Sequence, residues 1–198
     1  MVVFGITGGS GSGKTSVSKM LEKLGAHIID TDVIAHEIVE PNSDCLNELV
    51  DYFGDSILND DKTLNRKKLA SIAFSDKQKT EALSNITHKY IKAEVVKDIN
   101  TTDAELVGID GAVIIGSNVE PLCEFIVSVI ADKQSRITRI KTRDNITDEQ
   151  AIQRINAQND DEFYKENSMY IIYNNGDIAQ LESDVVGLFN KIKGNSFE

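Results

Sequence analysis

The sequence predicts an α/β fold in which helices cover a five-stranded parallel sheet. Short apolar runs of strand length alternate with segments of helical periodicity along the 198 residues, which is the order expected of a parallel sheet. The run at 125–131 is almost wholly apolar, as in strands that are covered on both faces. The first run, at 2–7, leads straight into a glycine-rich loop and then a helical pattern. These observations together favour a three-layer α/β domain.

The elements follow in a regular order. Val17, Met20, Leu21 and Leu24 recur at helical spacing after the loop, and Gly25 ends that helix. Further strands are expected at 27–30, 105–110, 125–131 and 170–174, and a closing helix at 178–191. We expect one domain, 1–198, with a core at about 1–40, 104–132 and 168–198, a helical insertion at about 41–103 and a lid at about 133–167.

Composition restricts the class of protein. A hydrophobic content of 40% with two prolines indicates an ordered globular chain. No apolar run approaches the roughly 18 residues of a membrane span, and the start lacks the features of a signal peptide, so a cytoplasmic location without membrane contact is expected. The net charge of −11 disfavours nucleic acid as a partner. Cys45 and Cys123 are isolated and are expected to be reduced structural thiols.

The glycine-rich loop at 8–15 fits Gly-x-x-x-x-Gly-Lys-Ser/Thr, the pattern of a phosphate-binding P-loop. Its glycines allow backbone amides to converge on phosphate oxygens, and the next helix adds its N-terminal donors. Lys14 would reach the β- and γ-phosphates, and the Thr15 hydroxyl would bind Mg²⁺. A Gly/Ser-rich turn is the alternative. The predicted ATP-binding residues here are Gly8, Gly9, Ser10, Gly11, Ser12, Gly13, Lys14, Thr15 and Ser16.

Carboxylates follow two of the expected strands. Asp30 and Asp32 come at the end of the second strand, and Asp110 ends the third. Ligands of open α/β sheets bind at this edge. Asp32 is therefore a candidate catalytic group, with helix capping or simple solvation as the alternative. Asp30 or Asp110 could help to hold the metal through water.

Four of the five arginines fall within nineteen residues. Arg136, Arg139 and Arg143 are spaced so that they share one side of a helix. A second helix, with Thr147 and Gln150 as a capping box, would carry Arg154 and Gln158 four residues apart. Two short helices with inward arginines predict a lid over transferring phosphates, and a salt-bridged surface helix is the alternative. The predicted lid residues are Arg136, Arg139, Arg143, Arg154 and Gln158.

Taken together, these motifs resemble the dephospho-CoA kinase family. The resemblance rests on residues 5–15, 29–39, 64–66, 86–88, Arg139, Arg143-Asp144, 154–158, Asn174 and Gly176. It implies a P-loop kinase fold with an inserted helical acceptor-binding part and a lid. It also implies transfer of the γ-phosphate of ATP to the ribose 3′-hydroxyl of dephospho-CoA, the last step of coenzyme A synthesis.

The resemblance also assigns roles by position. Lys14, Asp32 and Arg139 are the implied catalytic residues, with Asp32 as base or orienter of the 3′-hydroxyl. Arg143 and Asn174 join the ATP-binding residues. Mg²⁺ with ATP is the expected cofactor, ATP and dephospho-CoA are the small-molecule partners, and no protein partner is predicted. The implied acceptor-binding residues are Asp32, His36, Arg66 and His88.

The chain departs from the family pattern at several positions. Residues 112–116 replace a usual Pro-Leu-Leu-Phe-Glu run and place Gly116 where an acidic side chain is usual. Tyr164 replaces a lysine, Met169 replaces an aspartate, and Lys89 replaces a proline. Two alternatives therefore remain open: another small-molecule P-loop kinase, for a nucleoside or nucleotide, or a nucleotide-binding regulator that has lost turnover.

Overall fold

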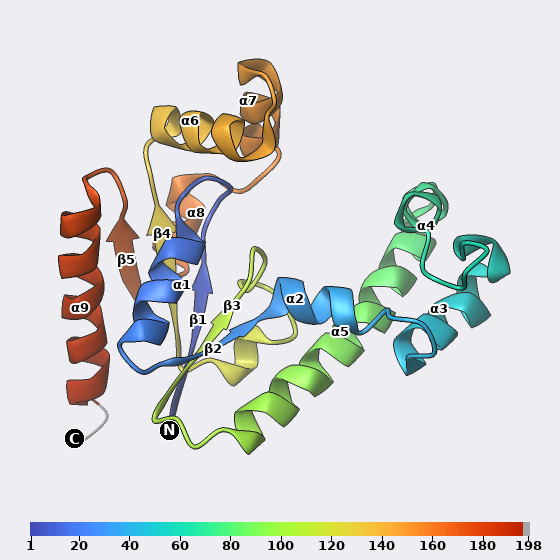
Figure 1. Cartoon of the computed structure of the whole chain (residues 1–198), viewed down its shortest axis with the longest axis horizontal. Helices are drawn as coiled ribbons and strands as arrows, with labels where there is room; N and C mark the ends of the chain where they lie inside the picture. Colours follow the sequence, from blue (N-terminus) through green and yellow to red (C-terminus); the bar gives the residue numbers. More distant parts are fainter. Residues whose placement is uncertain (196–198) are drawn as a thin grey trace. The chain divides into compact units, whose positions relative to one another are not determined.

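The computed structural model describes residues 1–195. The chain forms two compact units: a sheet unit, Met1–Asp30 with the segment from Thr102 onward, and a helical unit, Thr31–Thr101. Figure 1 labels their elements. No helix within the described residues is both long enough and apolar enough to cross a bilayer.

The sheet unit contains one parallel sheet of five strands in the order β2-β3-β1-β4-β5. This arrangement confirms the predicted fold class. In the register between β2 and β3, Asp30 lies beside Asp110, so two predicted carboxylates meet at the carboxyl edge. The strands are β1 (Val2–Thr7), β2 (His27–Asp30), β3 (Leu106–Asp110), β4 (Phe125–Ile130) and β5 (Tyr170–Tyr173).

Alternation along β1 divides the core between the two faces of the sheet. Phe4 and Ile6 are fully buried among side chains of α1 (Lys14–Lys23) and α9 (Ile178–Asn195). Gly5 faces the opposite side, where an added Cβ would lie 3.4 Å from Cys123 Sγ, just after η2 (Glu120–Leu122). Helical elements therefore cover both faces, and the loop between β1 and α1 emerges at the carboxyl edge (Figure 1).

Three short helices occupy the predicted lid region: α6 (Lys133–Asp144), α7 (Asp148–Asn156) and α8 (Asp161–Glu166). The predicted capping box at the start of α7 is present, with reciprocal bonds between Thr147 and Gln150. One prediction was wrong: α7 ends at Asn156, so Gln158 does not lie one helical turn after Arg154. The reason is local: the Gln158 amide donates to Ile155 O, three residues back, at 3.2 Å in place of the helical bond to Arg154 O, and Asp160 then caps the next helix.

The helical unit confirms the helical pattern predicted between 41 and 100. Its longest helix, α5 (Lys77–Thr101), contacts α2, α3 and α4. Ser43 and Asn65 cap α3 and α4 through their side-chain oxygens. The other elements are α2 (Thr31–Glu37), α3 (Asp44–Phe53), η1 (Asp55–Ile57) and α4 (Arg66–Ala73).

Candidate active site

The phosphate loop occupies the turn between β1 and α1. Gly13 caps α1 with φ 96° and ψ 19°, a left-handed conformation that favours glycine. A Cβ on Gly13 would lie 2.0 Å from Asn174 Nδ2, and a Cβ on Gly9 would lie 2.3 Å from Arg136 Nη2. Both positions therefore need glycine because side chains from distant segments lie against the backbone.

The carbonyl groups of this loop are held by the lid and by the segment after β5. Arg136 Nε donates to Ser10 O at 2.9 Å. Arg139 Nη1 donates to Gly11 O at 3.2 Å and to Ser12 O at 3.3 Å, and Asn174 Nδ2 also donates to Ser12 O, at 2.8 Å. Since C=O and N–H point in opposite directions across a trans peptide, the amides that follow Ser10 and Ser12 point away from these donors. That orientation leaves them available to an anion.

The start of α1 adds further donors. The first amides of a helix have no acceptor within the helix, and they lie at its positive end. Ser12 Oγ is the buried side-chain polar atom in residues 1–195 that has no hydrogen-bond partner, and such atoms are normally satisfied by water or a ligand. The shape and donors of the loop therefore fit a phosphate group.

Gln158 fastens the tip of the loop to the lid. Its Oε1 accepts the Ser10 amide at 2.8 Å, and its Nε2 donates to Ser10 Oγ at 3.2 Å. The same Oε1 also accepts from Arg136 Nη2 at 3.3 Å. Arg136 is only 5% exposed, and Asp161 Oδ1 lies 3.6 Å from its Nη1. Arg136 and Gln158 thus contact the loop backbone directly.

Arg143 and Arg154 lie elsewhere, which corrects the prediction of a single inward set of arginines. Arg143 donates to both carboxylate oxygens of Asp144, at 2.7 and 2.9 Å, and Arg154 pairs with the same carboxylate. Hydrogen bonding from Arg143, assisted by Arg154, lowers the pKa of Asp144 to about 2. Asp144 is the last residue of α6, and its two carboxylate oxygens bind the guanidinium of Arg143 in a bidentate manner. The ATP-binding role of Arg143 stays a prediction.

Lys14 forms an ion pair with Asp110 at the end of β3. Both side chains are largely buried, at 15% and 5% exposure. Ser18 Oγ donates to the other carboxylate oxygen, Asp110 Oδ2, at 2.7 Å. Sequence reasoning missed Ser18, although its position four residues after Lys14 places both on one side of α1. Ser18 orients the carboxylate that holds the loop lysine.

Hydroxyl and carboxylate oxygens near the loop are ligands of the type that a hard cation such as Mg²⁺ prefers. Thr15 supplies a hydroxyl beside Lys14, and Asp30 lies next to Asp110 in the sheet. Residues 1–195 hold no group of three or more His, Cys, Asp or Glu side chains arranged for a metal. Mg²⁺ is usually bound through one or two protein ligands together with water and substrate phosphates.

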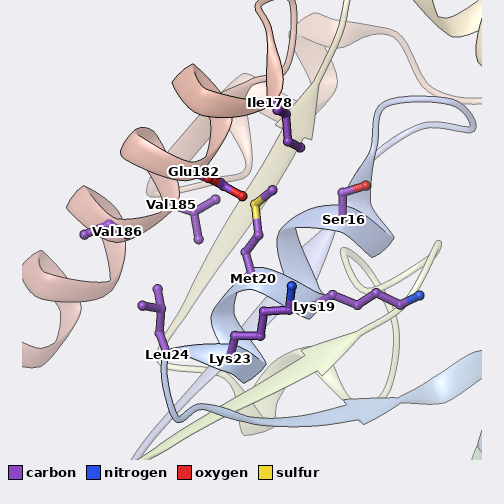
Figure 2. A pocket seen from close by; sticks show the side chains of 9 residues that line it. All are labelled: Ser16, Lys19, Met20, Lys23, Leu24, Ile178, Glu182, Val185 and Val186. Carbon is purple, nitrogen blue, oxygen red and sulfur yellow. The ribbon is translucent and has the colours of Figure 1, made fainter.

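A groove of about 460 Å³ runs between α1 and α9, with Ser16 among its lining residues. Figure 2 shows Met20 of α1 directed toward Glu182 and Ile178 of α9. Ser16 directly follows the loop and was predicted to bind ATP. The groove therefore begins next to the predicted nucleotide site and continues along the contact between the two helices.

The predicted acceptor residues belong to the helical unit. Asp32 lies in the first turn of α2 and His36 in its last turn, four residues later and on the same side. Arg66 Nη2 lies 2.9 Å from His36 Nδ1. Because a guanidinium only donates, Nδ1 is the acceptor in this contact. His88 of α5 has Ser84 Oγ at 3.4 Å from its Nδ1. The structure thus brings His36 and Arg66 together.

Comparison with known proteins decides the family. A model of the dephospho-CoA kinase family matches residues 2–180. The chain belongs to the dephospho-CoA kinase family. A dephospho-CoA kinase of Lactobacillus johnsonii is 34% identical over 191 residues, covering 95% of this chain and 96% of the relative.

Solved structures agree with this assignment. A dephospho-CoA kinase from Campylobacter jejuni aligns with a TM-score of 0.69 and 26% identity, over 98% of each chain. A Thermus thermophilus protein aligns with a TM-score of 0.83 and 24% identity, over 96% of this chain and 97% of that protein. At that identity the second likeness supports the fold alone. The resemblance to dephospho-CoA kinases predicted from the motifs is confirmed.

Proposed function

We propose that this protein transfers the γ-phosphate of ATP to the ribose 3′-hydroxyl of dephospho-CoA, giving coenzyme A and ADP in the last step of coenzyme A synthesis. The observation that carries the proposal is the phosphate loop with Lys14 beside it, in a chain of the dephospho-CoA kinase family. ATP and dephospho-CoA are the proposed substrates. The cytoplasm is the proposed location, without a nucleic acid, membrane or protein partner.

The loop binds and orients the phosphates of ATP. Loop amides that point away from the lid, such as those of Gly11 and Gly13, and the ammonium group of Lys14 neutralise charge on the β- and γ-phosphates. For this role Lys14 exchanges its ion pair with Asp110 for phosphate oxygens. Bound Mg²⁺ supplies further neutralisation of the phosphate charge, and the residues that would hold it are Thr15 and, through water, Asp30 or Asp110. Ser16, Arg143 and Asn174 complete the proposed ATP site.

Asp32 is the proposed base or orienter of the acceptor hydroxyl. A loose phosphoryl-transfer transition state needs an aligned nucleophile more than a strong base, and a carboxylate suits this task. His36, Arg66 and His88 are proposed to bind the acceptor, and the His36–Arg66 contact gives the first two a shared polar surface. Asp32→Asn should lower kcat by about 10²-fold or more and leave ATP affinity nearly unchanged. Near-normal turnover in this variant would remove Asp32 from the mechanism.

The lid is proposed to supply charge and exclude water during transfer. Arg139 is the group assigned to the transferring phosphate, and its present bonds to the loop carbonyls keep it next to that site. Arg136 and Gln158 fix the loop, and Arg143 and Arg154 complete the predicted lid set.

One assay separates this function from its alternatives. ADP release is measured from ATP with dephospho-CoA, AMP and uridine in parallel, with and without Mg²⁺. The expected result is rapid, Mg²⁺-dependent release of ADP when dephospho-CoA is the acceptor, and no such release with AMP or uridine. Turnover only with AMP or uridine would point to a nucleoside or nucleotide kinase. Nucleotide binding without turnover would point to a regulator.

A further inference from the structure

A half-enclosed cavity of about 210 Å³ lies beside the phosphate loop, within the sheet unit. It is bounded by the end of β1, by the segment that follows β3, by the segment between α7 and α8, and by α8 itself. Thr7 directly precedes the loop, and Gln158 bonds to Ser10 within it, so two lining residues adjoin the loop. The residues that matter for its chemistry are Thr7, Ile114, Ile115, Gln158, Phe163 and Tyr164.

The cavity is preformed by buried groups. Thr7 and Ile114 are each about 1% exposed and Tyr164 is 5% exposed. Thr7 Oγ1 donates to Ala112 O at 3.3 Å, which ties the segment after β3 to the end of β1. Phe163 and Tyr164 meet edge to face, with centroids 5.7 Å apart and planes at 80°. The aromatic wall therefore holds a defined orientation.

The lining combines aromatic surface with a few polar groups. The Tyr164 hydroxyl forms no hydrogen bond with any residue in 1–195, although the ring is almost fully buried. Because Ser12 Oγ is the buried side-chain polar atom without a partner in these residues, the Tyr164 hydroxyl oxygen keeps some solvent access and is open to a ligand. Burial also raises the pKa of Tyr164, so the hydroxyl keeps its proton. The side-chain amide of Gln158 lies on the same cavity.

The size and lining of the cavity define the class of group that it takes. Pockets for whole drug-sized ligands measure roughly 300–1,000 Å³, so this smaller cavity suits one ring system. Apolar and aromatic walls with a few polar atoms favour a planar heterocycle that carries hydrogen-bonding groups.

The topology of the sheet indicates which substrate supplies that ring. The segment 112–115 follows β3, and β3 lies between β1 and β2, on the side of the loop that carries Asp30. Asn174, proposed to contact ATP, follows β5 at the other side of the sheet. In the proposed reaction the base is attached to the ribose whose 3′-hydroxyl attacks the phosphate. The base must therefore lie close to the phosphate loop, separated from it by the ribose. The cavity meets this requirement because Thr7 and Gln158 both line it and adjoin the loop.

We propose that this cavity binds the adenine ring of the acceptor, with Phe163 as the aromatic wall and the Tyr164 hydroxyl as a hydrogen-bonding group. This inference rests on the proposed function, which names the acceptor but assigns no residue to its base. It makes Phe163 and Tyr164 specificity-determining residues.

Steady-state kinetics of two variants test the subsite. Tyr164→Phe removes only the hydroxyl and should raise the KM for dephospho-CoA about 2- to 10-fold, the range of one hydrogen bond. Phe163→Ala should raise it by about 10-fold or more, as expected for loss of a stacking surface. In both variants the KM for ATP and the kcat at saturating acceptor should change less than about 2-fold. Tyr173→Phe, which removes the hydroxyl of a half-exposed tyrosine of the same unit, is the matched control and should leave every constant unchanged.

An acceptor with a changed base supplies a second readout. A dephospho-CoA analogue with uracil in place of adenine should have a higher KM than dephospho-CoA in the wild type, and Phe163→Ala should reduce this difference. An altered KM for ATP with an unchanged acceptor KM would assign the cavity to the donor and overturn the subsite. Unchanged acceptor constants in both variants would overturn it as well, while leaving the proposed function intact. Absence of wild-type turnover with dephospho-CoA would instead overturn the proposed function, and the subsite with it.

Discussion

The two pairs of arginines in the lid show how one residue type serves two purposes. Arg136 and Arg139 bond to carbonyl oxygens of the phosphate loop, and Arg136 is almost fully buried. Arg143 and Arg154 share Asp144, and their side chains are 60% and 44% exposed. Four similar side chains within nineteen residues thus divide into a loop-facing pair and a carboxylate-facing pair. The partner and the burial decide the role of each arginine.

The difference in burial between the two pairs determines how much free energy each arginine is expected to contribute. A buried carbonyl that loses its donor costs about 1–3 kcal/mol, because the group keeps its desolvation penalty. An exposed ion pair contributes only about 0–1 kcal/mol, since solvent and salt screen it. Variants of the loop-facing pair should therefore alter nucleotide binding and transfer more than a variant of Arg154, which pairs with Asp144 at the surface.

The largest effect is expected for Arg139→Ala. Loss of its charge from the transferring phosphate should lower kcat by about 10²-fold or more, the range for removal of one electrostatic donor. ATP affinity should fall less than kcat. Single-turnover rates and equilibrium ATP binding measure the two effects separately. A change confined to KM would contradict the proposed role in transfer.

Arg136→Met is expected to act on binding. It removes the Arg136 donor to Ser10 O and one of the two donors to Gln158 Oε1, so the Kd for Mg²⁺-ATP should rise about 5- to 150-fold, equivalent to 1–3 kcal/mol. Titration calorimetry measures the change. Arg154→Met is the matched control on the exposed pair and should change the Kd less than about 3-fold, within the energy of a surface ion pair. Equal losses in the two variants would abolish the distinction between the pairs.

Gln158→Ala should have a smaller effect. It removes an acceptor for the Ser10 amide and a donor to its hydroxyl, while Arg136 continues to hold Ser10 O. An increase of about 2- to 10-fold in the Kd for Mg²⁺-ATP is expected from the net value of such hydrogen bonds. Faster hydrogen exchange at the loop amides should accompany it. Tighter nucleotide binding would show that Gln158 restrains the loop in an unproductive shape.

Asp144→Asn should have the smallest effect on activity and a pH-dependent effect on stability. The pKa of Asp144 is about 2 in the folded protein, below its ordinary value, so ionisation favours the folded state. The contribution is present above about pH 4 and is lost as the pH falls through about 2. The Tm of the wild type should exceed that of the variant at pH 7, and the two should converge near pH 2. A difference in Tm that grew on acidification would contradict this sign.

The local parts of this structure could be predicted from the sequence, and the long-range pairings could not. The strand, loop and helix at 2–24 follow from a motif and helical periodicity within one continuous segment, and the capping box of Thr147 and Gln150 is equally local. The spacing of Arg136 and Arg139 indicated a common side of the helix but not that its partners would be loop carbonyls. Ser18 was missed because its partner, Asp110, lies 92 residues away. Asp32 was a candidate from its position after the second strand, family resemblance supplied its role as base or orienter, and that role remains a prediction.

The most direct test of the proposed function follows the transferred phosphate. Enzyme is mixed with ATP labelled in the γ-phosphate, Mg²⁺ and dephospho-CoA, and the product is isolated after a single turnover. The label is expected in a monoester at the ribose 3′-position, with one ADP formed per labelled product. Label recovered only as inorganic phosphate, or at another position of the acceptor, would contradict the proposed reaction.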